Sequence, residues 1–510
     1  MRATTRMESH RAQAGVAGEG EERRVIREPP SYDLQSLPEE HVDVCETILK
    51  LLPCKDRARA ACLNRAWRVA VCKPNLWHHL DLSFASVGEV TDRALLGAVA
   101  EADGQLRSLD ISEQKRITRP ALYRALEGNA QVTELMVSKL SNEDEVLDDD
   151  IKMLKLDDLT ALAAAAPNLL TLHASLECQQ GEAGQVLRRE GVFERVQLHS
   201  LKVTGTMTPN DLQGLIQDAA LLAANSTLAT LILNHNRIGA EGAGELVRAL
   251  EANSRLTTLS LMGNDIRGGG ALALGLMLMM MNSALTTLDL AVNNIGDEGA
   301  KDLGLALFTN STLTTLNLYC NNIRAGGAVW LGRALARNST MTTLNLRQNN
   351  IGAEGARELG RALAVNSTLT TLDLGYNNIG TEGAQELGRA LAANSNSTLT
   401  TLSLMGNYIG DGTLELGLML KKNSTLTTLD VASNRIGDEG ARELGRALAE
   451  NSTLTTLDLC GNDISDDGAL ALEQALAVNP TLITLKLTAN RMREATRHAL
   501  RERHGDRLQL

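Results

Sequence analysis

Aromatic residues and proline are scarce in this sequence. Only 2% of the 510 residues are Phe, Trp or Tyr, and only nine are proline. Hydrophobic residues still make up 43% of the chain, so any large core must be aliphatic. An aliphatic core in a chain of this length is typical either of several domains or of one array of small stacked units.

Cysteine and histidine are present but form no recognisable site. The seven cysteines include no C-x-x-C pair, and none of the nine histidines completes a set of metal ligands. G-x-S-x-G, H-E-x-x-H and a phosphate-binding loop are all absent, and the glycines of Arg267–Ala271 lack the G-K-[ST] ending. We therefore predict reduced thiols, no metal, no cofactor, no catalytic residue and no enzymatic activity.

Long apolar runs and an excess of positive charge are also missing. The longest apolar run, Ala271–Met281, is too short to span a bilayer, and residues 1–30 lack the apolar segment of a signal peptide. The net charge of −12 argues against a general nucleic-acid binder, because phosphate contacts need clustered Lys and Arg. We expect a cytoplasmic or nuclear protein that contacts neither membrane nor nucleic acid and favours a neutral or basic protein partner.

A pattern L-x-x-L-x-L-x-x-N fills the second half of the chain. Its copies are 27 to 30 residues apart, most often 28. They begin at Leu228, Leu256, Leu285, Leu313, Met341, Leu369, Leu399, Leu426, Leu454 and Leu482. Weaker copies begin at Trp77, Leu106, Val132, Leu169 and Leu198. The period and the pattern resemble the leucine-rich repeat of the long, ribonuclease-inhibitor type.

Each unit predicts a strand, a turn and a helix. In the copy that starts at Leu313, Leu316 and Leu318 alternate with polar residues, as in a strand with one buried face. Asn321, the ninth residue, has an amide that can bond backbone groups of its own turn and of the neighbouring turn. A helix such as Glu354–Asn366 follows, and we expect Asn366 to cap it in a left-handed conformation.

The predicted fold is an α/β leucine-rich-repeat solenoid, or horseshoe. Stacked strands are about 4.8 Å apart and packed helices roughly 8–10 Å, so the parallel sheet should line the inside and the helices the outside. We assign residues 83–227 to degenerate repeats with an acidic loop at 141–150. Residues 228–490 form the regular repeats and 491–510 a helical C-terminal cap.

Residues 31–82 differ in character from the repeats and precede them as a small all-α module, after a disordered N-terminus at residues 1–30. The string contains "LPEE", "ILKLL", Pro53 three residues before Asp56, and Arg65-x-Trp67. This string resembles an F-box, although Arg57 stands where that family usually has Leu. The resemblance implies docking onto the Skp-type adaptor of a cullin ubiquitin ligase through Leu37, Pro38, Ile48, Leu49, Leu52 and Pro53. A plain N-terminal helical cap on the solenoid is the alternative.

Function should lie in the variable positions on the concave face, which are the third, fifth and seventh of the pattern. The third is always Thr, the fifth is rich in acids, and the seventh holds the bulky side chains. Tyr and Arg often dominate protein interfaces, and acids can steer a basic partner. We therefore predict that an unknown, basic protein target contacts Tyr319, Arg347, Tyr376, Asp289, Asp373 and Asp430.

Three functions are compatible with this organisation. The first is a substrate-recognition subunit of an F-box (SCF-type) ubiquitin ligase. The second is a cytosolic binding scaffold without ubiquitin function, similar to ribonuclease inhibitor or to the repeat half of immune receptors. The third is a regulator of a small GTPase, because Ran GTPase-activating proteins use the same repeat class.

Overall fold

The chain divides into two compact units, Met1–Val71 and Cys72–Leu510. The computed structural model describes residues 227–510, apart from 251–252, 281–283 and 395–396, and shorter segments upstream. These segments are 79–81, 92–102, 104–111, 117–137, 139–141, 151–153, 162, 165–175 and 199–204. Every element described below therefore belongs to the second unit.

Sixteen strands of this unit form one parallel sheet, in which strands follow their order along the chain. Five precede the regular repeats: β1 (His79–Asp81), β2 (Ser108–Asp110), β3 (Glu134–Val137), β6 (Thr171–Ser175) and β7 (Ser200–Thr204). Ten belong to them: β8 (Thr230–Ile232), β9 (Thr258–Ser260), β10 (Thr287–Asp289), β11 (Thr315–Asn317), β12 (Thr343–Asn345), β13 (Thr371–Asp373), β14 (Thr401–Ser403), β15 (Thr428–Asp430), β16 (Thr456–Asp458) and β17 (Thr484–Lys486). All fifteen predicted strands are present, and β18 (Leu508–Gln509) adds one more.

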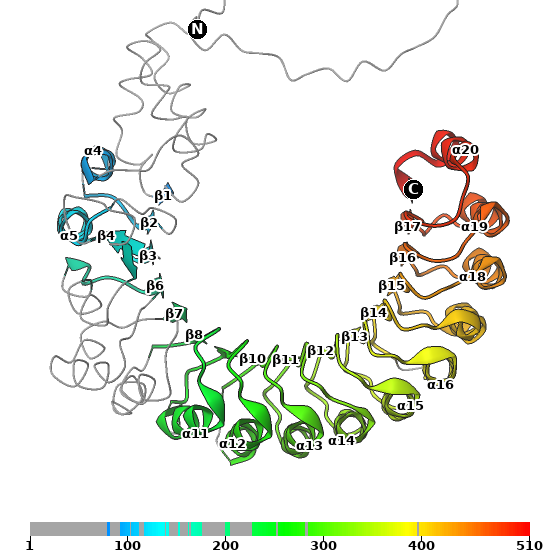
Figure 1. Cartoon of the computed structure of the whole chain (residues 1–510), viewed down its shortest axis with the longest axis horizontal. Coiled ribbons are helices and arrows are strands. Elements are labelled where there is room, and N and C mark those ends of the chain that lie inside the picture. The colour runs from blue at the N-terminus through cyan, green and yellow to red at the C-terminus, as the bar shows by residue number, and fades with distance from the viewer. Residues whose placement is uncertain are drawn as a thin grey trace, which may run out of the picture. The chain divides into compact units, whose positions relative to one another are not determined.

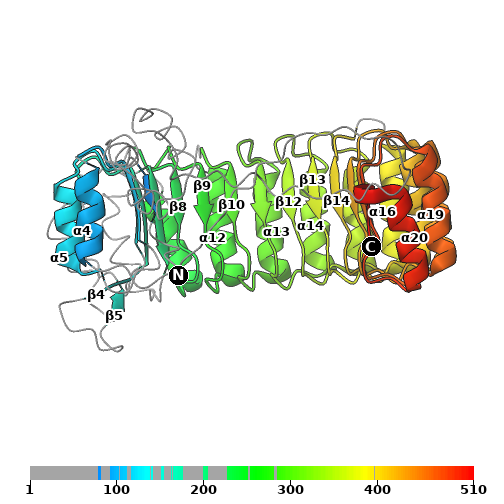
Figure 2. The same cartoon turned by 90° about the horizontal axis from the view of Figure 1, so that it is seen from above.

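Helices alternate with these strands and cover the outer side of the sheet (Figures 1 and 2). Upstream lie α4 (Asp92–Glu101) and α5 (Arg119–Glu127). The regular array contains α11 (Gly239–Leu250), α12 (Arg267–Met280), α13 (Gly296–Leu307), α14 (Ala325–Leu335), α15 (Gly352–Leu363), α16 (Gly380–Ala393), α17 (Thr413–Lys422), α18 (Asp438–Glu450) and α19 (Asp466–Val478). The solenoid predicted from the repeat pattern is therefore confirmed. Within the described residues, no helix is both long and apolar enough to cross a membrane.

The recurring leucines of the repeat pattern form the core. Leu372 at the centre of β13 is fully buried, as are Leu369 and Leu374 around it. The preceding helix, α15, contributes the buried side chains of Leu359 and Leu363. The side chains between these leucines on the strand are only half-buried, so the strands alternate as predicted.

The ninth-position asparagines form a buried ladder between repeats. The Oδ1 atom of Asn264 accepts the N–H groups of Asn236 and Ile238, two residues of the preceding repeat, at 2.8 and 3.4 Å. Its Nδ2 atom donates to the carbonyl of Leu233 in that repeat and to Leu261 in its own. The predicted role of this amide in its own and the neighbouring turn is confirmed.

The residues on either side of the ladder asparagine often adopt left-handed backbone, as Tyr376 and Asn378 do around Asn377. The eighth position lies at positive φ in Tyr376 (55°) and in the β-branched residue Val292 (58°). A β-branched residue is strained in this region. At other repeats the same position is glycine, as in Gly406 (φ 69°).

Two sequence predictions need correction at helix ends and at the tail. The helix-ending asparagines are extended and not left-handed, as Asn451 shows with φ −79°. Asn366 instead uses its amide, which accepts from Leu369 N–H and donates to Leu335 in the preceding repeat. The tail forms the expected helix α20 (Glu494–His504), but it then returns to the sheet as β18, pairing with β17.

The acidic insertion lies in a hairpin that the repeat pattern did not predict. Antiparallel strands β4 (Lys139–Ser141) and β5 (Ile151–Met153) pair on either side of it. The residues between these strands lie outside the described part of the chain, as does the predicted disordered N-terminus.

Candidate functional site

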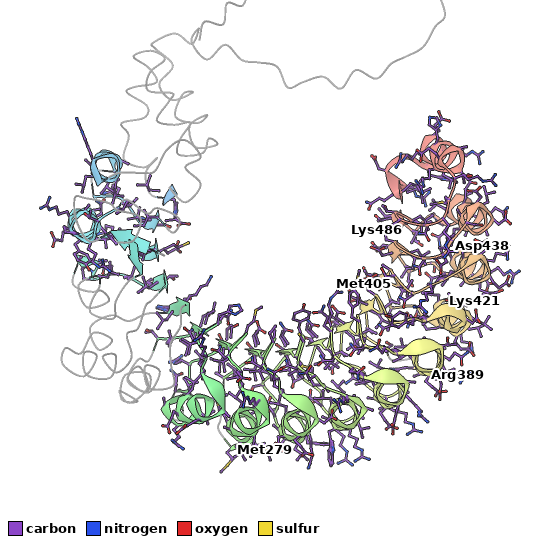
Figure 3. All side chains as sticks on the ribbon, viewed as in Figure 1. Met279, Arg389, Met405, Lys421, Asp438 and Lys486 are labelled. Carbon is purple, nitrogen blue, oxygen red and sulfur yellow. The ribbon has the colours of Figure 1, made fainter. Side chains whose placement is uncertain are left out.

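The inner surface of the sheet, called the sheet face below, carries the third, fifth and seventh residues of each repeat pattern. Met405 and Lys486 lie on this side, whereas Met279, Arg389 and Lys421 lie on the helical side (Figure 3). Strand register places equivalent residues side by side, as in Asn345 opposite Asp373. The sheet face is thus a regular grid in which only the side chains differ.

The acids of the fifth row take part in the scaffold. The Oδ1 atom of Asp373 accepts the N–H of Gly375 two residues on, at 2.8 Å. Asp289 and Asp430 bond Ala291 and Ala432 in the same way, each at 3.0 Å. This turn bond explains why Asp and Asn recur in the row, a structural role that we did not predict from the sequence.

Serine hydroxyls connect some of these acids across strands. Ser260 donates to Oδ2 of Asp289 at 3.2 Å, and Ser403 donates to Oδ2 of Asp430 at 3.0 Å. Further along, Asp458 forms an ion pair with Lys486 at 3.1 Å. The negative charge of the row is therefore hydrogen-bonded on several sides and partly neutralised at one end.

The surroundings of Asp373 shift its pKa. Burial, the largest cause, raises its pKa above the usual value, and the nearby charge of Asp430 raises it further. The Gly375 N–H and the positive charge of Arg347 oppose this rise without cancelling it. Ionisation of Asp373 on the sheet face therefore costs free energy in the folded chain.

Arg347 extends across the neighbouring repeats toward the C-terminal end of the array. Its Cζ atom lies 4.7 Å from the centroid of the Tyr376 ring, and its Nη2 atom lies 3.4 Å from Sδ of Met405. Glycine makes this path possible, because a Cβ on Gly375 would lie 3.0 Å from Nη1 of Arg347. The predicted site residues Arg347 and Tyr376 are therefore brought together.

Tyr319 belongs to the strand next to Arg347 but not to this stack. Cys320, which follows it, donates its N–H to the Arg347 carbonyl at 3.0 Å, so the two backbones are neighbours as predicted. The Tyr319 side chain is half-buried. The contacts of the Arg347 guanidinium with Tyr376 and Met405 lie on the opposite side, toward later repeats.

A second stack of the same kind was missed at the level of the sequence. The guanidinium Cζ of Arg435 lies 4.5 Å from the centroid of the Tyr408 ring, and Tyr408 is 50% exposed. Both residues occupy the tenth position of their repeats, at positive φ. The predicted site included only the third, fifth and seventh rows, with Tyr376 beside them, although an aromatic residue beside an arginine in the tenth row is visible in the sequence.

The helical side shows fewer distinctive features. Trp330 of α14 is half-buried beneath Arg333, whose Cζ lies 5.1 Å from the centroid of its ring. Leu276 of α12 is 44% exposed, in line with its position in the pattern. In the regular helices Arg and Glu pair three residues apart, as Arg389 and Glu386 do at 2.7 Å.

The predicted adaptor-binding residues lie outside the described part of the chain. They are Leu37, Pro38, Ile48, Leu49, Leu52 and Pro53. Among the residues that the structure does describe, no group of three or more His, Cys, Asp or Glu side chains could hold a metal ion.

Comparisons with known proteins agree with the predicted F-box and with the predicted leucine-rich repeats. A family model described as F-box-like matches residues 34–83. The model described as Leucine Rich repeat matches nine segments: 224–247, 252–275, 282–304, 309–331, 337–360, 365–388, 395–415, 422–445 and 450–472.

Whole-chain similarity to characterised proteins is low. A search of curated proteins gave no match. Among solved structures, one chain of the crystal structure of the Rad7 and Elc1 complex in yeast aligns with 17% identity and a TM-score of 0.45. The alignment covers 78% of this chain and 89% of that chain. An F-box-like domain followed by leucine-rich repeats is the organisation of a protein-interaction scaffold, and this pairing matches that of F-box proteins with leucine-rich repeats.

Proposed function

We propose that this protein is the substrate-recognition subunit of an F-box (SCF-type) ubiquitin ligase. The observation that carries the proposal is the F-box-like match at residues 34–83, directly ahead of a repeat array that offers a long binding surface. The F-box-like domain would bind a Skp-type adaptor, and the repeats would hold the target. Ubiquitin transfer would then belong to other subunits, and this chain would itself not be an enzyme.

The adaptor would contact the apolar residues at the start of the domain. We assign this contact to Leu37, Pro38, Ile48, Leu49, Leu52 and Pro53, which supply apolar surface at the positions typical of F-box domains. A short helical module of this size buries little surface by itself and gains stability from such a partner.

The target would bind on the sheet face, where side chains vary on a fixed grid. Arg347 and Tyr376 form a rigid stack there, with Tyr319 on the preceding strand. The fifth-row acids Asp289, Asp373 and Asp430 lie beside them and favour a basic segment of the target. Attraction between these acids and a basic segment would be electrostatic, so association should weaken as salt is added.

A direct binding assay tests the adaptor half of the proposal. Purified full-length protein should bind a purified Skp-type adaptor, and the double change Leu49→Asp with Leu52→Asp should abolish binding. The thermal transition of the repeats should not change in that variant, because the leucines lie outside them. An intact protein that binds no adaptor would leave the scaffold without a ubiquitin function, as in ribonuclease-inhibitor-like proteins, immune-receptor repeats or small-GTPase regulators.

Affinity capture of the target tests the other half. Targets recovered with the full-length protein should be lost from the Tyr319→Ala, Arg347→Ala double variant, with binding weakened by more than about 2 kcal/mol. Trp330→Ala on α14 is the matched control, since it removes a large aromatic side chain from the helical side. Damage from the control and not from the double variant would place the target on the helices.

A further inference from the structure

Two tyrosine–arginine stacks flank one turn of the array, the segment Met405–Tyr408. Arg347 approaches this turn from earlier repeats, stacking on Tyr376 and reaching Sδ of Met405. Arg435 approaches it from the following repeat and stacks on the ring of Tyr408. The two guanidinium groups therefore lean toward the same turn from opposite directions.

No carboxylate lies within ion-pair distance of either guanidinium among the described residues, although the positive charge of Arg347 acts to lower the pKa of Asp373. Ion pairs within 4.0 Å engage Arg389, Arg442 and Arg446 on the helical side, but they involve neither Arg347 nor Arg435. Stacking on a ring fixes the guanidinium plane, and apart from the Arg347 Nη2 contact with Met405 Sδ the N–H groups at its edge can still donate. Two donors held in this way are prepared to bind a carboxylate through paired, charge-assisted hydrogen bonds.

The turn between the stacks carries a glycine that packs against the ring of Tyr376. A Cβ on this glycine, Gly406, would lie 2.6 Å from two ring carbons of Tyr376. Tyr376 and Tyr408 are 38% and 50% exposed, and Met405 adds an apolar contact. This is the mixture of Tyr, Arg and Met that is enriched in protein interfaces.

Charge differs between this turn and the strands beside it. Asp373 and Asp430 lie on β13 and β15, two residues before the turn-side row, so the sheet itself repels an anion. An anionic group would therefore be attracted to the turn and not to the centre of the sheet.

We propose that the turn edge, formed by Arg347, Tyr376, Met405, Tyr408 and Arg435, binds an acidic segment of the protein target. The inference rests on the proposed function, in which the sheet face holds a target, and adds the chemistry of one contact. A target segment would place a carboxylate between the two arginines while a basic residue lies over the fifth row.

Selection from displayed short random peptides tests this assignment with the full-length protein as bait. Bound peptides should be enriched in Asp and Glu over the input library. The double change Arg347→Gln with Arg435→Gln should remove that enrichment and weaken the best acidic peptide about tenfold or more, as expected for charge-assisted hydrogen bonds. Replacing the acids of that peptide by Gln and Asn should weaken binding to the unaltered protein equally.

Arg333→Gln with Arg337→Gln is the matched control. These arginines stack on Trp330 and Phe308 on the helical side, at 5.1 and 5.6 Å, so the control loses the same charge and the same kind of contact. Equal loss in the control, or no enrichment of acids, would overturn the proposal. Peptides that lack acids but depend on Tyr319 would overturn it as well, while leaving the sheet-face target site and the adaptor assay untouched.

Discussion

The carboxylate of Asp438 caps the helix of the following repeat through Ser465, whose hydroxyl and backbone N–H donate to it at 2.6 and 2.7 Å. Gly468 adds a third donor at 3.1 Å. Asp438 itself lies in the first turn of α18, so one side chain joins the starts of α18 and α19. Asp297 makes the corresponding contact with α14, through Arg324 and Gly327.

Asp438→Ala should destabilise the array by about 1–2 kcal/mol, as for loss of a helix N-cap. The variant leaves the N–H groups of Ser465 and Gly468 without their acceptor. Asp467→Ala is the control, because this exposed acid lies in the same first turn of α19 without such bonds. Urea unfolding should separate the two variants, and equal losses would contradict the capping role.

The contribution of Asp438 should depend on pH. Burial raises its pKa, but the hydrogen bonds from Ser465 and Gly468 and the charge of Arg442 outweigh burial, so the pKa is lowered from 3.8. An acid with a lowered folded pKa stabilises the fold above its usual pKa and loses this effect as pH falls through the folded value. The gap between the wild type and Asp438→Ala should therefore be constant above about pH 5 and close in stronger acid, when unfolding is followed across pH.

Asp373→Asn should show the opposite dependence. Burial raises the pKa of Asp373, so ionisation of its carboxyl group destabilises the folded chain relative to the unfolded chain. Asn keeps an oxygen for the Gly375 N–H and removes the charge. We expect the variant to equal or exceed the wild type in melting temperature at pH 7, and the difference to vanish at low pH; a lower melting temperature at pH 7 would contradict this account.

Leu372→Ala should cost about 2–5 kcal/mol, because the side chain is fully buried between repeats. Asp373, one residue later, lies on the sheet face. Asp373→Ala should therefore cost only about 1 kcal/mol, through the lost hydrogen bond to Gly375. Thermal unfolding of the two variants compares them directly. Similar losses would contradict the orientation of β13.

Val292→Asn should stabilise the protein. Val292 has φ 58° and is exposed, and left-handed backbone costs roughly 1–2 kcal/mol for most residues. Asn tolerates this conformation better and places no charge there. Val365→Asn, an exposed valine just beyond α15, should give no such gain; an equal rise in melting temperature for both would show that strain is not the cause.

Sequence periodicity was sufficient to predict the scaffold because backbone geometry repeats with it. Leu372 and Asn264 occupy buried positions that the pattern specifies, and their contacts are as expected. The prediction of helix ends was less accurate, because the side chain of Asn366 donates to the Leu335 carbonyl of the preceding repeat and needs no left-handed backbone. The final strand β18 is too short to show a pattern of its own.

The candidate site was only partly predictable because it depends on side-chain direction. Row position places Arg347 beside Tyr319, which is in the same row, but the Arg347 side chain passes over Gly375 and stacks on Tyr376. The sequence also did not reveal that Asp373 both carries charge and accepts a hydrogen bond from the Gly375 N–H. An acidic residue in the row indicates charge but not which of its oxygens is already bonded.

The asparagine ladder gives the array a polarity. The side-chain bonds that link Asn264 and Asn407 to a neighbouring repeat run backward, to backbone groups of the repeat before them. Each turn is therefore completed by the repeat that is synthesised after it, which at 5–20 residues per second emerges roughly 1–6 s later. A nascent or C-terminally truncated array ends in a turn whose backbone N–H groups lack the asparagine acceptor of the next repeat, whereas removal of a first repeat takes partners from the side-chain amide of the next asparagine.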